Sequence, residues 1–118
     1  MDYSAQIRGN ILIVKINGEL DDFCAQNMRD KLDFILVRKD IKHVIFDLSS
    51  LNFMDSAGIG LMIGRYKTVR GREGKGVIVC TNDYINRILK MSGVYKLFEH
   101  AEELDDAVEN LNRKKVLV

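Results

Sequence analysis

Three short runs of apolar, mostly β-branched residues recur along this 118-residue chain, and each is followed by a segment with helical periodicity. The runs occupy residues 11–16, 43–47 and 77–80. Runs of this kind favour β-strands, and a nearly continuous apolar run is typical of a strand that is buried on both faces. A weaker alternation at residues 3–8, followed by the turn dipeptide Gly9-Asn10, adds an edge strand. The sequence therefore predicts a single α/β domain with a mixed β-sheet of about four to five strands flanked by about four helices.

Three of the predicted helices begin at a polar residue that is suited to cap them. Asp21 or Asp22 is expected to cap a first helix that runs to about residue 37. A second helix is expected from Asp55-Ser56 to about Arg70, with Gly71 just beyond its end. The other expected elements are a helix capped by Asn82 or Asp83 and stopped by Gly93, a brief strand at 95–98, and a last helix around 104–111 with Arg113, Lys114 and Lys115 at its basic end.

Two polar segments, residues 17–21 and 48–54, are predicted to be loops that follow strands and lead into helices. Loops that follow parallel strands gather at one end of the sheet, and functional residues are concentrated there. We therefore expect Glu19 and Asp21 in the first loop to lie beside Asp55 and Ser56 at the end of the second.

Ser56 stands at the start of the second predicted helix, among the small residues Ala57, Gly58 and Gly60. A Ser or Asp at this place most often caps the helix, which would give Ser56 or Asp55 a purely structural role. Alternatively, the Ser56 hydroxyl is exposed and is modified or bound. Glycine costs roughly 1 kcal/mol against alanine in a helix interior, so two glycines in the first turns favour a surface that is kept bare.

The composition narrows the classes of function. The formal net charge is +1, so no overall field attracts nucleic acid or an anionic membrane. No apolar run reaches the roughly 20 residues that span a bilayer, and no signal-peptide pattern is present at the start of the sequence. Cys24 and Cys80 form no CxxC motif and are expected to be buried free thiols of a cytoplasmic protein. A basic set is interpreted as the solvated end of the second helix, and Tyr66 within it as a core or a partner-binding residue; the set comprises Arg65, Lys67, Arg70, Arg72 and Lys75.

Enzymatic interpretations of Ser56 fit poorly. A serine hydrolase needs a histidine base, and His43 is expected to open a strand while His100 follows the last one. The G-x-S-x-G elbow is absent, because Met54 occupies its first glycine position. The glycines at 58, 60 and 64 faintly resemble a dinucleotide fingerprint, but the long loop expected before this helix replaces the tight turn that the fingerprint requires.

Several segments resemble those of a known family. Asp55-Ser56-Ala57-Gly58-Ile59-Gly60, preceded by Leu51-Asn52-Phe53-Met54, resembles the signature of the STAS domain family of bacterial anti-sigma factor antagonists, and Gly18-Glu19-Leu20-Asp21 resembles its early-loop motif. The segments 64–67 and 91–94 are similar to one branch, stage II sporulation protein AA. The resemblance covers nearly the whole chain, so that residues 1–118 would form one STAS domain. Some members carry a second serine where this chain has Ala57, which leaves Ser56 as the one hydroxyl at the helix start.

The resemblance implies a non-enzymatic switch in the cytoplasm. The unphosphorylated chain would bind an anti-sigma factor that is also a serine kinase and would thereby release a sporulation sigma factor. The kinase would phosphorylate Ser56, which switches the chain off, and a serine phosphatase would reverse this. The partner-binding residues would be Glu19, Asp21, Asp55, Ser56, Ala57 and Gly58, with Asp21 alternatively serving only as a cap.

The kinase, and not this chain, would hold ATP or ADP and magnesium, so neither a cofactor nor a metal is expected here. A monomer is expected that binds neither nucleic acid nor membrane. Two alternatives within the family are an antagonist of a general stress pathway and a STAS subunit of a transport system.

Overall fold

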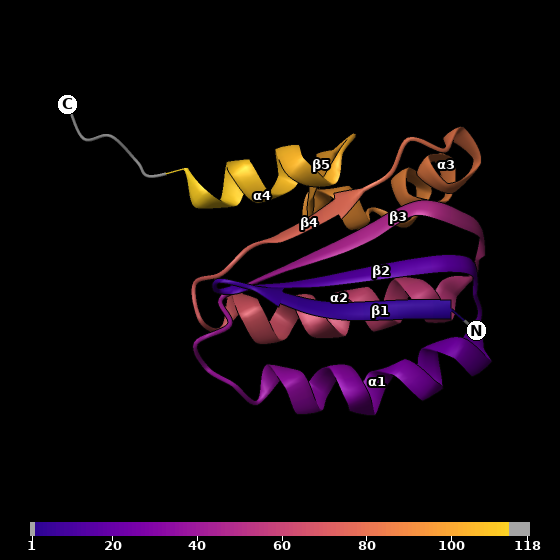
Figure 1. The fold of residues 1–118 in the computed structure, drawn as a ribbon. Coiled ribbons are helices and arrows are strands. Elements are labelled where there is room, and N and C mark those ends of the chain that lie inside the picture. The colour runs from indigo at the N-terminus through magenta and orange to yellow at the C-terminus, as the bar shows by residue number, and fades with distance from the viewer. Residues whose placement is uncertain (1, 114–118) are drawn as a thin grey trace.

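Five strands form one sheet in the computed structural model, which describes residues 2–113. The strands are β1 (Asp2–Arg8), β2 (Ile11–Leu20), β3 (His43–Met54), β4 (Gly76–Val79) and β5 (Glu99–Ala101), and they lie side by side in chain order (Figure 1). β1 is antiparallel to β2, whereas β2, β3, β4 and β5 run parallel. The predicted mixed sheet is confirmed.

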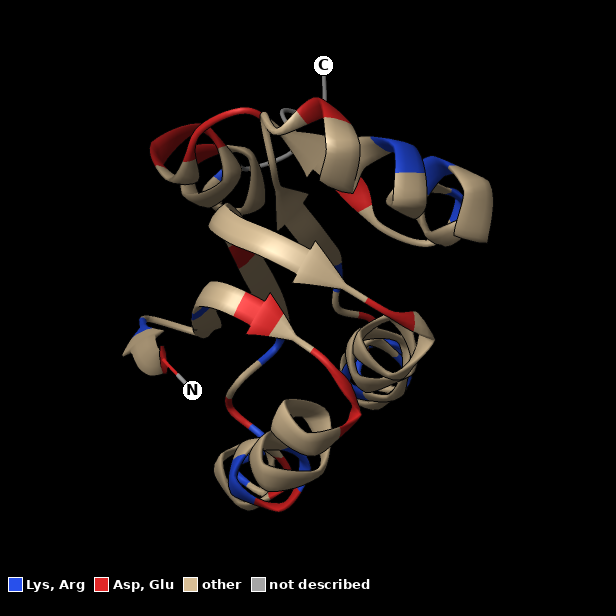
Figure 2. Ribbon diagram, turned by 90° about the vertical axis from the view of Figure 1, so that its right-hand side faces the viewer, with Lys and Arg blue, Asp and Glu red and all other residues tan. Residues whose placement is uncertain are grey.

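Helices cover both faces of this sheet, because each crossover between parallel strands needs one. They are α1 (Asp22–Leu36), α2 (Ser56–Arg70), α3 (Asp83–Ser92) and α4 (Leu104–Asn112). α1, α2 and α3 pack on one face around a large apolar core, while α4 covers part of the other face (Figure 2). Lys114 and Lys115, which were expected at the basic end of the last helix, lie outside the described residues.

The two parallel strands β2 and β3 are longer than their apolar runs predicted. β2 continues through residues 17–20 and β3 through residues 48–54, both of which were expected to be loops. The extended part of β2 pairs through its backbone with the extended part of β3, with Leu20 opposite Met54. The register shifts twice along the pair of strands. Pairing between distant segments therefore overrides the polar composition of both stretches.

The segment after α3 also differs from its prediction. Gly93 adopts a left-handed conformation and ends α3, after which residues 94–96 form one turn of 3₁₀-helix where a strand was expected. Phe98 then packs edge-on against Phe46, with ring centroids 6.1 Å apart, and the last strand begins one residue later. Gly71 lies just beyond α2, as expected, in a right-handed conformation, and Glu73 takes the left-handed one.

The basic set in and just after α2 is only partly a solvated helix end. Arg65 is buried and forms an ion pair with Asp33 of α1 at 2.9 Å. Arg72 donates to the backbone carbonyls of Leu36, Arg38 and Ile41, and so closes the carboxyl end of α1. Half-buried Tyr66 lies 5.1 Å from the Phe98 ring, which identifies it as a packing residue.

The two cysteines are buried free thiols, as predicted. Among the helices of residues 2–113, none combines the length and the apolar character that a membrane crossing requires.

Candidate functional site

The carboxyl ends of all four parallel strands lie at one end of the domain, and each leads into a helix. We call this end the exit surface; it comprises residues 19–22, 53–56, 81–83 and 102–103. Figure 2 looks onto it and shows acidic segments where β2 leads into α1 and where β3 leads into α2. The exit surface is therefore both the place where functional loops of α/β sheets gather and a region of negative charge.

The structure brings the two predicted segments of the site together. Glu19 lies opposite Phe53 in the register of β2 and β3, and the Asp55 N–H donates to the Leu20 carbonyl at 3.3 Å. Asp21 and Asp55 thus leave the sheet from adjacent positions on neighbouring strands. At this end of the sheet Glu19 is exposed and Asp21 is half-buried.

Two aspartates cap the helices of the exit surface. The Asp55 carboxylate accepts from the Ala57 N–H at 2.9 Å, and the Asp21 carboxylate accepts from the Cys24 N–H at 2.9 Å. The backbone hydrogen bond from Cys24 lowers the pKa of Asp21 below its usual range, which keeps this carboxylate ionised. The caps are therefore Asp55 and Asp21, and the alternative candidates, Ser56 and Asp22, are free of that role.

Ser56 is therefore exposed and does not cap the helix. It is the first residue of α2, and its hydroxyl has no hydrogen-bond partner within residues 2–113. The N–H groups of a first helical turn lack intrahelical acceptors and carry the positive end of the helix dipole. A group attached to this hydroxyl would lie where negative charge is stabilised.

The glycines of α2 have different roles. A Cβ atom at Gly58 would lie 2.8 Å from the Cγ atoms of Leu20 and Met54, so buried Gly58 lets α2 approach the strand ends. A Cβ at Gly60 or Gly64 would meet no atom within 4 Å. Ser56, Gly60 and Gly64 recur every four residues, which leaves one line of the helix without large side chains. Half-buried Ala57 packs against the core.

The exit surface also contains residues that the sequence analysis did not place in the site. Phe53, opposite Glu19, keeps 39% of its surface exposed, and Phe23, in the first turn of α1, keeps 72%. Asn82 caps α3 at the end of β4, through a bond from the Ile85 N–H. The sequence could have placed Asn82 on this surface. A helix cap that directly follows a buried parallel strand lies at the same end of the sheet as the other caps.

The hydrolase interpretation gains no support from the placement of the histidines. His43 opens β3, at the far end of a 12-residue strand from Ser56, and its Nδ1 accepts from the Lys75 N–H. His100 lies within β5, not after it, and contacts the Cys80 carbonyl. The turn between β3 and α2 is tight, so the long loop that we expected there, and that argued against a dinucleotide site, is wrong. The glycines nevertheless lie inside α2 and not in that turn. Within residues 2–113 no three acidic, histidine or cysteine side chains converge as a metal site would require.

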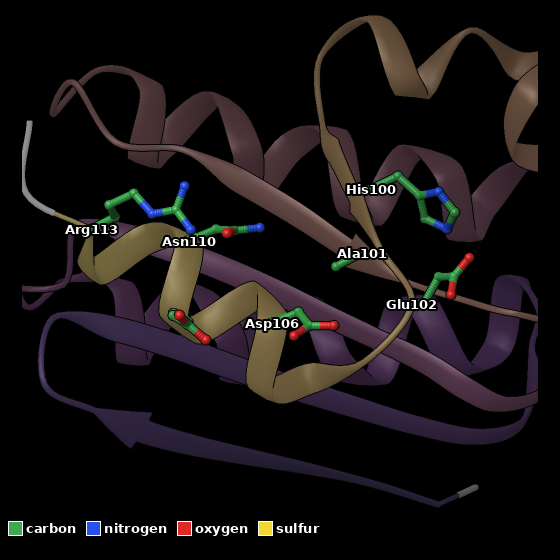
Figure 3. Close-up of a pocket in the computed structure, with 7 residues that line it drawn as sticks. His100, Ala101, Glu102, Asp106, Asn110 and Arg113 are labelled. Carbon is green, nitrogen blue, oxygen red and sulfur yellow. The ribbon is translucent and has the colours of Figure 1, made fainter.

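A polar hollow of about 410 Å³ lies between the end of β5 and α4 (Figure 3). His100 and Glu102 reach it from the β5 segment, and Asp106, Asn110 and Arg113 from α4. It contains none of the predicted site residues. Its mixed charges identify a solvated seam between helix and strand, distinct from the exposed hydroxyl of Ser56.

Together, the fold and the exit surface define a small α/β domain whose candidate site is a bare helix start with an exposed serine among acids. In a comparison with protein families, the model of the STAS domain matches residues 2–109 of the chain. The chain therefore belongs to the STAS domain family.

Curated relatives and solved structures are similar over most of the chain. The anti-sigma F factor antagonist of Paenibacillus polymyxa is 36% identical over 87 residues, 74% of either chain. The anti-sigma-B factor antagonist of Listeria monocytogenes is 29% identical over 84 residues, 71% of this chain and 73% of the relative. The structure of the anti-sigma factor antagonist SpoIIAA in its unphosphorylated form superposes with a TM-score of 0.78 at 17% identity, covering 96% of this chain and all of that one. The phosphorylated form from Bacillus gives 0.76 at 20% identity, over 94% and 100% of the two chains.

Proposed function

We propose that this chain is an anti-sigma factor antagonist that switches between two states at Ser56. In the unphosphorylated state it binds an anti-sigma factor with serine kinase activity, which releases the sigma factor in the cytoplasm. The kinase transfers a phosphoryl group from ATP to Ser56 and the complex dissociates; a serine phosphatase restores the binding state. The chain itself catalyses no reaction and holds no cofactor, since the nucleotide and magnesium belong to the kinase.

One observation carries this proposal: the Ser56 hydroxyl is exposed at the start of α2 while Asp55 performs the capping. A kinase needs a hydroxyl that it can enclose without unfolding the helix. Other hydroxyls nearby are less suited. The Ser49 hydroxyl donates to the buried Asp47 carboxylate, and the Thr68 hydroxyl lies 3.5 Å from the Gly64 carbonyl of its own helix.

A phosphate on Ser56 is expected to change the surface and not the fold. It adds about −1.5 to −2 charges and three acceptor oxygens at the amino end of α2, where the Asp55 carboxylate already accepts from the Ala57 N–H. The helix dipole stabilises such a charge, so the phosphorylated domain stays folded. The change therefore acts on the partner, which meets added bulk and added negative charge at the same place.

The neighbouring acids make the exit surface sensitive to that added charge. Glu19, Asp21 and Asp55 lie on the exit surface together with Ser56, and a partner that binds them supplies positive charge matched to those carboxylates. Phosphorylation places further negative charge among them and offers bulk where the partner fitted a small hydroxyl. The bare line through Gly60 gives the partner close access to the helix, whereas Gly58 acts through internal packing.

One relative favours the sporulation branch of the family. Identity to the anti-sigma F antagonist of Paenibacillus polymyxa is 36%, against 29% to the anti-sigma-B antagonist of Listeria monocytogenes over a similar length, whereas the anti-sigma F antagonist of Lysinibacillus sphaericus is 25% identical. An antagonist of a stress pathway remains the second candidate because the anti-sigma-B relatives cover a similar share of the chain. Parallel binding assays with an anti-sigma F and an anti-sigma-B factor distinguish the two, and the proposal expects the tighter binding to the first.

The modification is tested by incubating the chain with the anti-sigma F kinase and ATP and by mapping the product by mass spectrometry. We expect one phosphate, on Ser56, and none after Ser56→Ala. Ser50→Ala is the matched control, because Ser50 is also exposed and lies six residues earlier; it should leave phosphorylation unchanged. A phosphate on Ser49, Ser50 or Thr68 in the wild-type chain would overturn the assignment.

A second assay tests the non-enzymatic part of the proposal. The isolated chain should hydrolyse neither an activated ester nor ATP. Turnover that disappears in Ser56→Ala would show that Ser56 is a catalytic nucleophile and would refute the switch.

A further inference from the structure

β1 leaves one edge of the sheet open. It pairs with β2 on one side, and within residues 2–113 no strand pairs with its other side. Six of its seven residues are exposed and only Tyr3 is half-buried. In Figure 2 the strand that starts at the N label lies at the outer edge of the sheet, with no helix beyond it. The unpaired N–H and C=O groups of such an edge are a template for another strand.

The usual protections of an exposed edge are missing from β1. Natural edge strands are blunted by proline, by inward-pointing lysine, by a bulge or by shortness. β1 contains neither proline nor lysine, and all seven residues stay in one-to-one register with β2. The opposite edge is different, because β5 has only three residues. β1 is therefore the edge that is competent to pair.

We propose that β1 pairs antiparallel with β1 of a second copy of this chain, about a twofold axis at Ala5. In this register Asp2 lies opposite Arg8 of the second copy, and the reverse pair repeats the contact. Tyr3 lies opposite Ile7, an aromatic residue against a β-branched one, and polar Ser4 lies opposite Gln6. Opposite charges and aromatic–β-branched pairs are the favourable cross-strand combinations of antiparallel sheets.

Neighbouring registers lack this complementarity. With the axis at Ser4, Asp2 would face Gln6 and Arg8 would have no opposite residue. With the axis at Gln6, Arg8 would face Ser4 and Asp2 would have none. Tyr3 and Ile7 both lie on the face that carries the larger core, because side chains alternate between the faces of a sheet, and only the register centred on Ala5 sets them opposite each other there. The sequence of β1 therefore specifies one self-pairing register.

The paired dimer leaves both candidate sites accessible. The twofold axis reverses the direction of the second sheet, so the two exit surfaces point to opposite ends of a continuous ten-stranded sheet. The pairing replaces the monomer expected from the sequence with a reversible dimer. Seven residues of edge contact fall short of the roughly 1,200 Å² that stable interfaces bury, so we expect a dissociation constant on the order of 10–100 μM.

Sedimentation equilibrium of the full chain from about 5 μM to 1 mM tests this proposal. The average mass should rise from 13.5 kDa toward twice that value. Arg8→Asp places like charges opposite each other and should weaken dimerisation at least about tenfold, whereas adding Asp2→Arg to it should restore most of the loss. Lys31→Asp, the same change of charge at an exposed position of α1, should have no effect.

Cross-linking tests the register directly. Opposite residues of an antiparallel pair have Cα atoms about 4.5–5.5 Å apart, within disulfide range, so Ala5→Cys should oxidise to a covalent dimer. Ile7→Cys should not, because its own copy lies four residues along the strand. Cys24 and Cys80 are buried and give no background. A monomeric mass throughout, or a dimer that is insensitive to Arg8→Asp and not captured by Ala5→Cys, would overturn the proposal.

Discussion

Two glycines of α2, Gly58 and Gly60, should respond in opposite directions to substitution by alanine. Gly58 lies in the first turn of the helix and Gly60 in the second, so each substitution gains up to roughly 0.5–1 kcal/mol of helix propensity. Gly60→Ala meets no atom within 4 Å and should keep that gain. At Gly58 the new Cβ would lie 2.8 Å from the mid-chain Cγ atoms of the buried residues Leu20 and Met54, and neither can move without shifting the core. Overpacking of this kind typically costs about 1–3 kcal/mol.

The difference between the two variants isolates the packing contribution, because the propensity gain is common to both. We expect Gly58→Ala to be less stable than Gly60→Ala by about 1–3 kcal/mol, or roughly 3–6 °C of melting temperature for each kcal/mol in a domain of this size. The chain has no tryptophan, so urea unfolding is followed by circular dichroism. Equal stabilities with equal m-values would show that α2 does not need a bare position against the strand ends.

Three further substitutions test separate contacts. Asp21→Asn keeps a capping side chain but removes the charge, so it should weaken binding of the anti-sigma factor while stability, measured by urea unfolding, stays within about 0.5 kcal/mol. Asp33→Ala removes the partner of the buried Arg65 guanidinium and should cost about 1–2 kcal/mol in the same assay, whereas Asp30→Ala, on the exposed face of α1, should cost less than about 0.5 kcal/mol. Burial lowers the pKa of His43 below its unfolded value of about 6.5, so the unfolded chain binds the proton more readily and stability should fall as the pH drops below about 6.5. His43→Gln should flatten that part of the pH profile, and an unchanged slope would contradict the assignment.

Local signals in the sequence were sufficient for the centre of the sheet and for the helix starts. The β-branched runs at 11–16 and 43–47 lie in strands, and the run at 77–80 does so up to Val79, because such residues pack well on a sheet buried on both faces. Asp21 and Asn82 were each one of two possible caps. The choice between adjacent polar residues depends on where the backbone turns into the helix, which composition does not encode.

Long-range pairing accounts for the largest error. Residues 48–54 include Ser49, Ser50 and Asn52, a composition typical of a loop, yet they extend β3. Their backbone groups are satisfied by the extension of β2, and Leu51 and Met54 are buried beneath α2 and its neighbours. Neither segment signals a strand alone, because the stabilising partner is remote in sequence.

The candidate site was predictable in position but not in the roles of its residues. The rule that parallel strands exit together placed Glu19 and Asp21 beside Asp55. The sequence treated Gly58 and Gly60 alike, as residues that keep a surface bare, whereas only Gly60 faces open space. The two glycines differ because they point in different directions from the helix axis. Which of them is buried depends on how α2 packs on the strand ends.

The central claim is that phosphorylation of Ser56 abolishes a binding surface without unfolding the domain. It is tested most directly by calorimetric titration of the anti-sigma F factor with the unmodified chain and with the chain phosphorylated on Ser56. We expect affinity to fall at least about 100-fold, since like charges brought together at an interface cost several kcal/mol. The circular dichroism spectrum and the melting temperature should stay nearly unchanged. Equal affinity of the two forms, or loss of binding only together with loss of structure, would contradict the account.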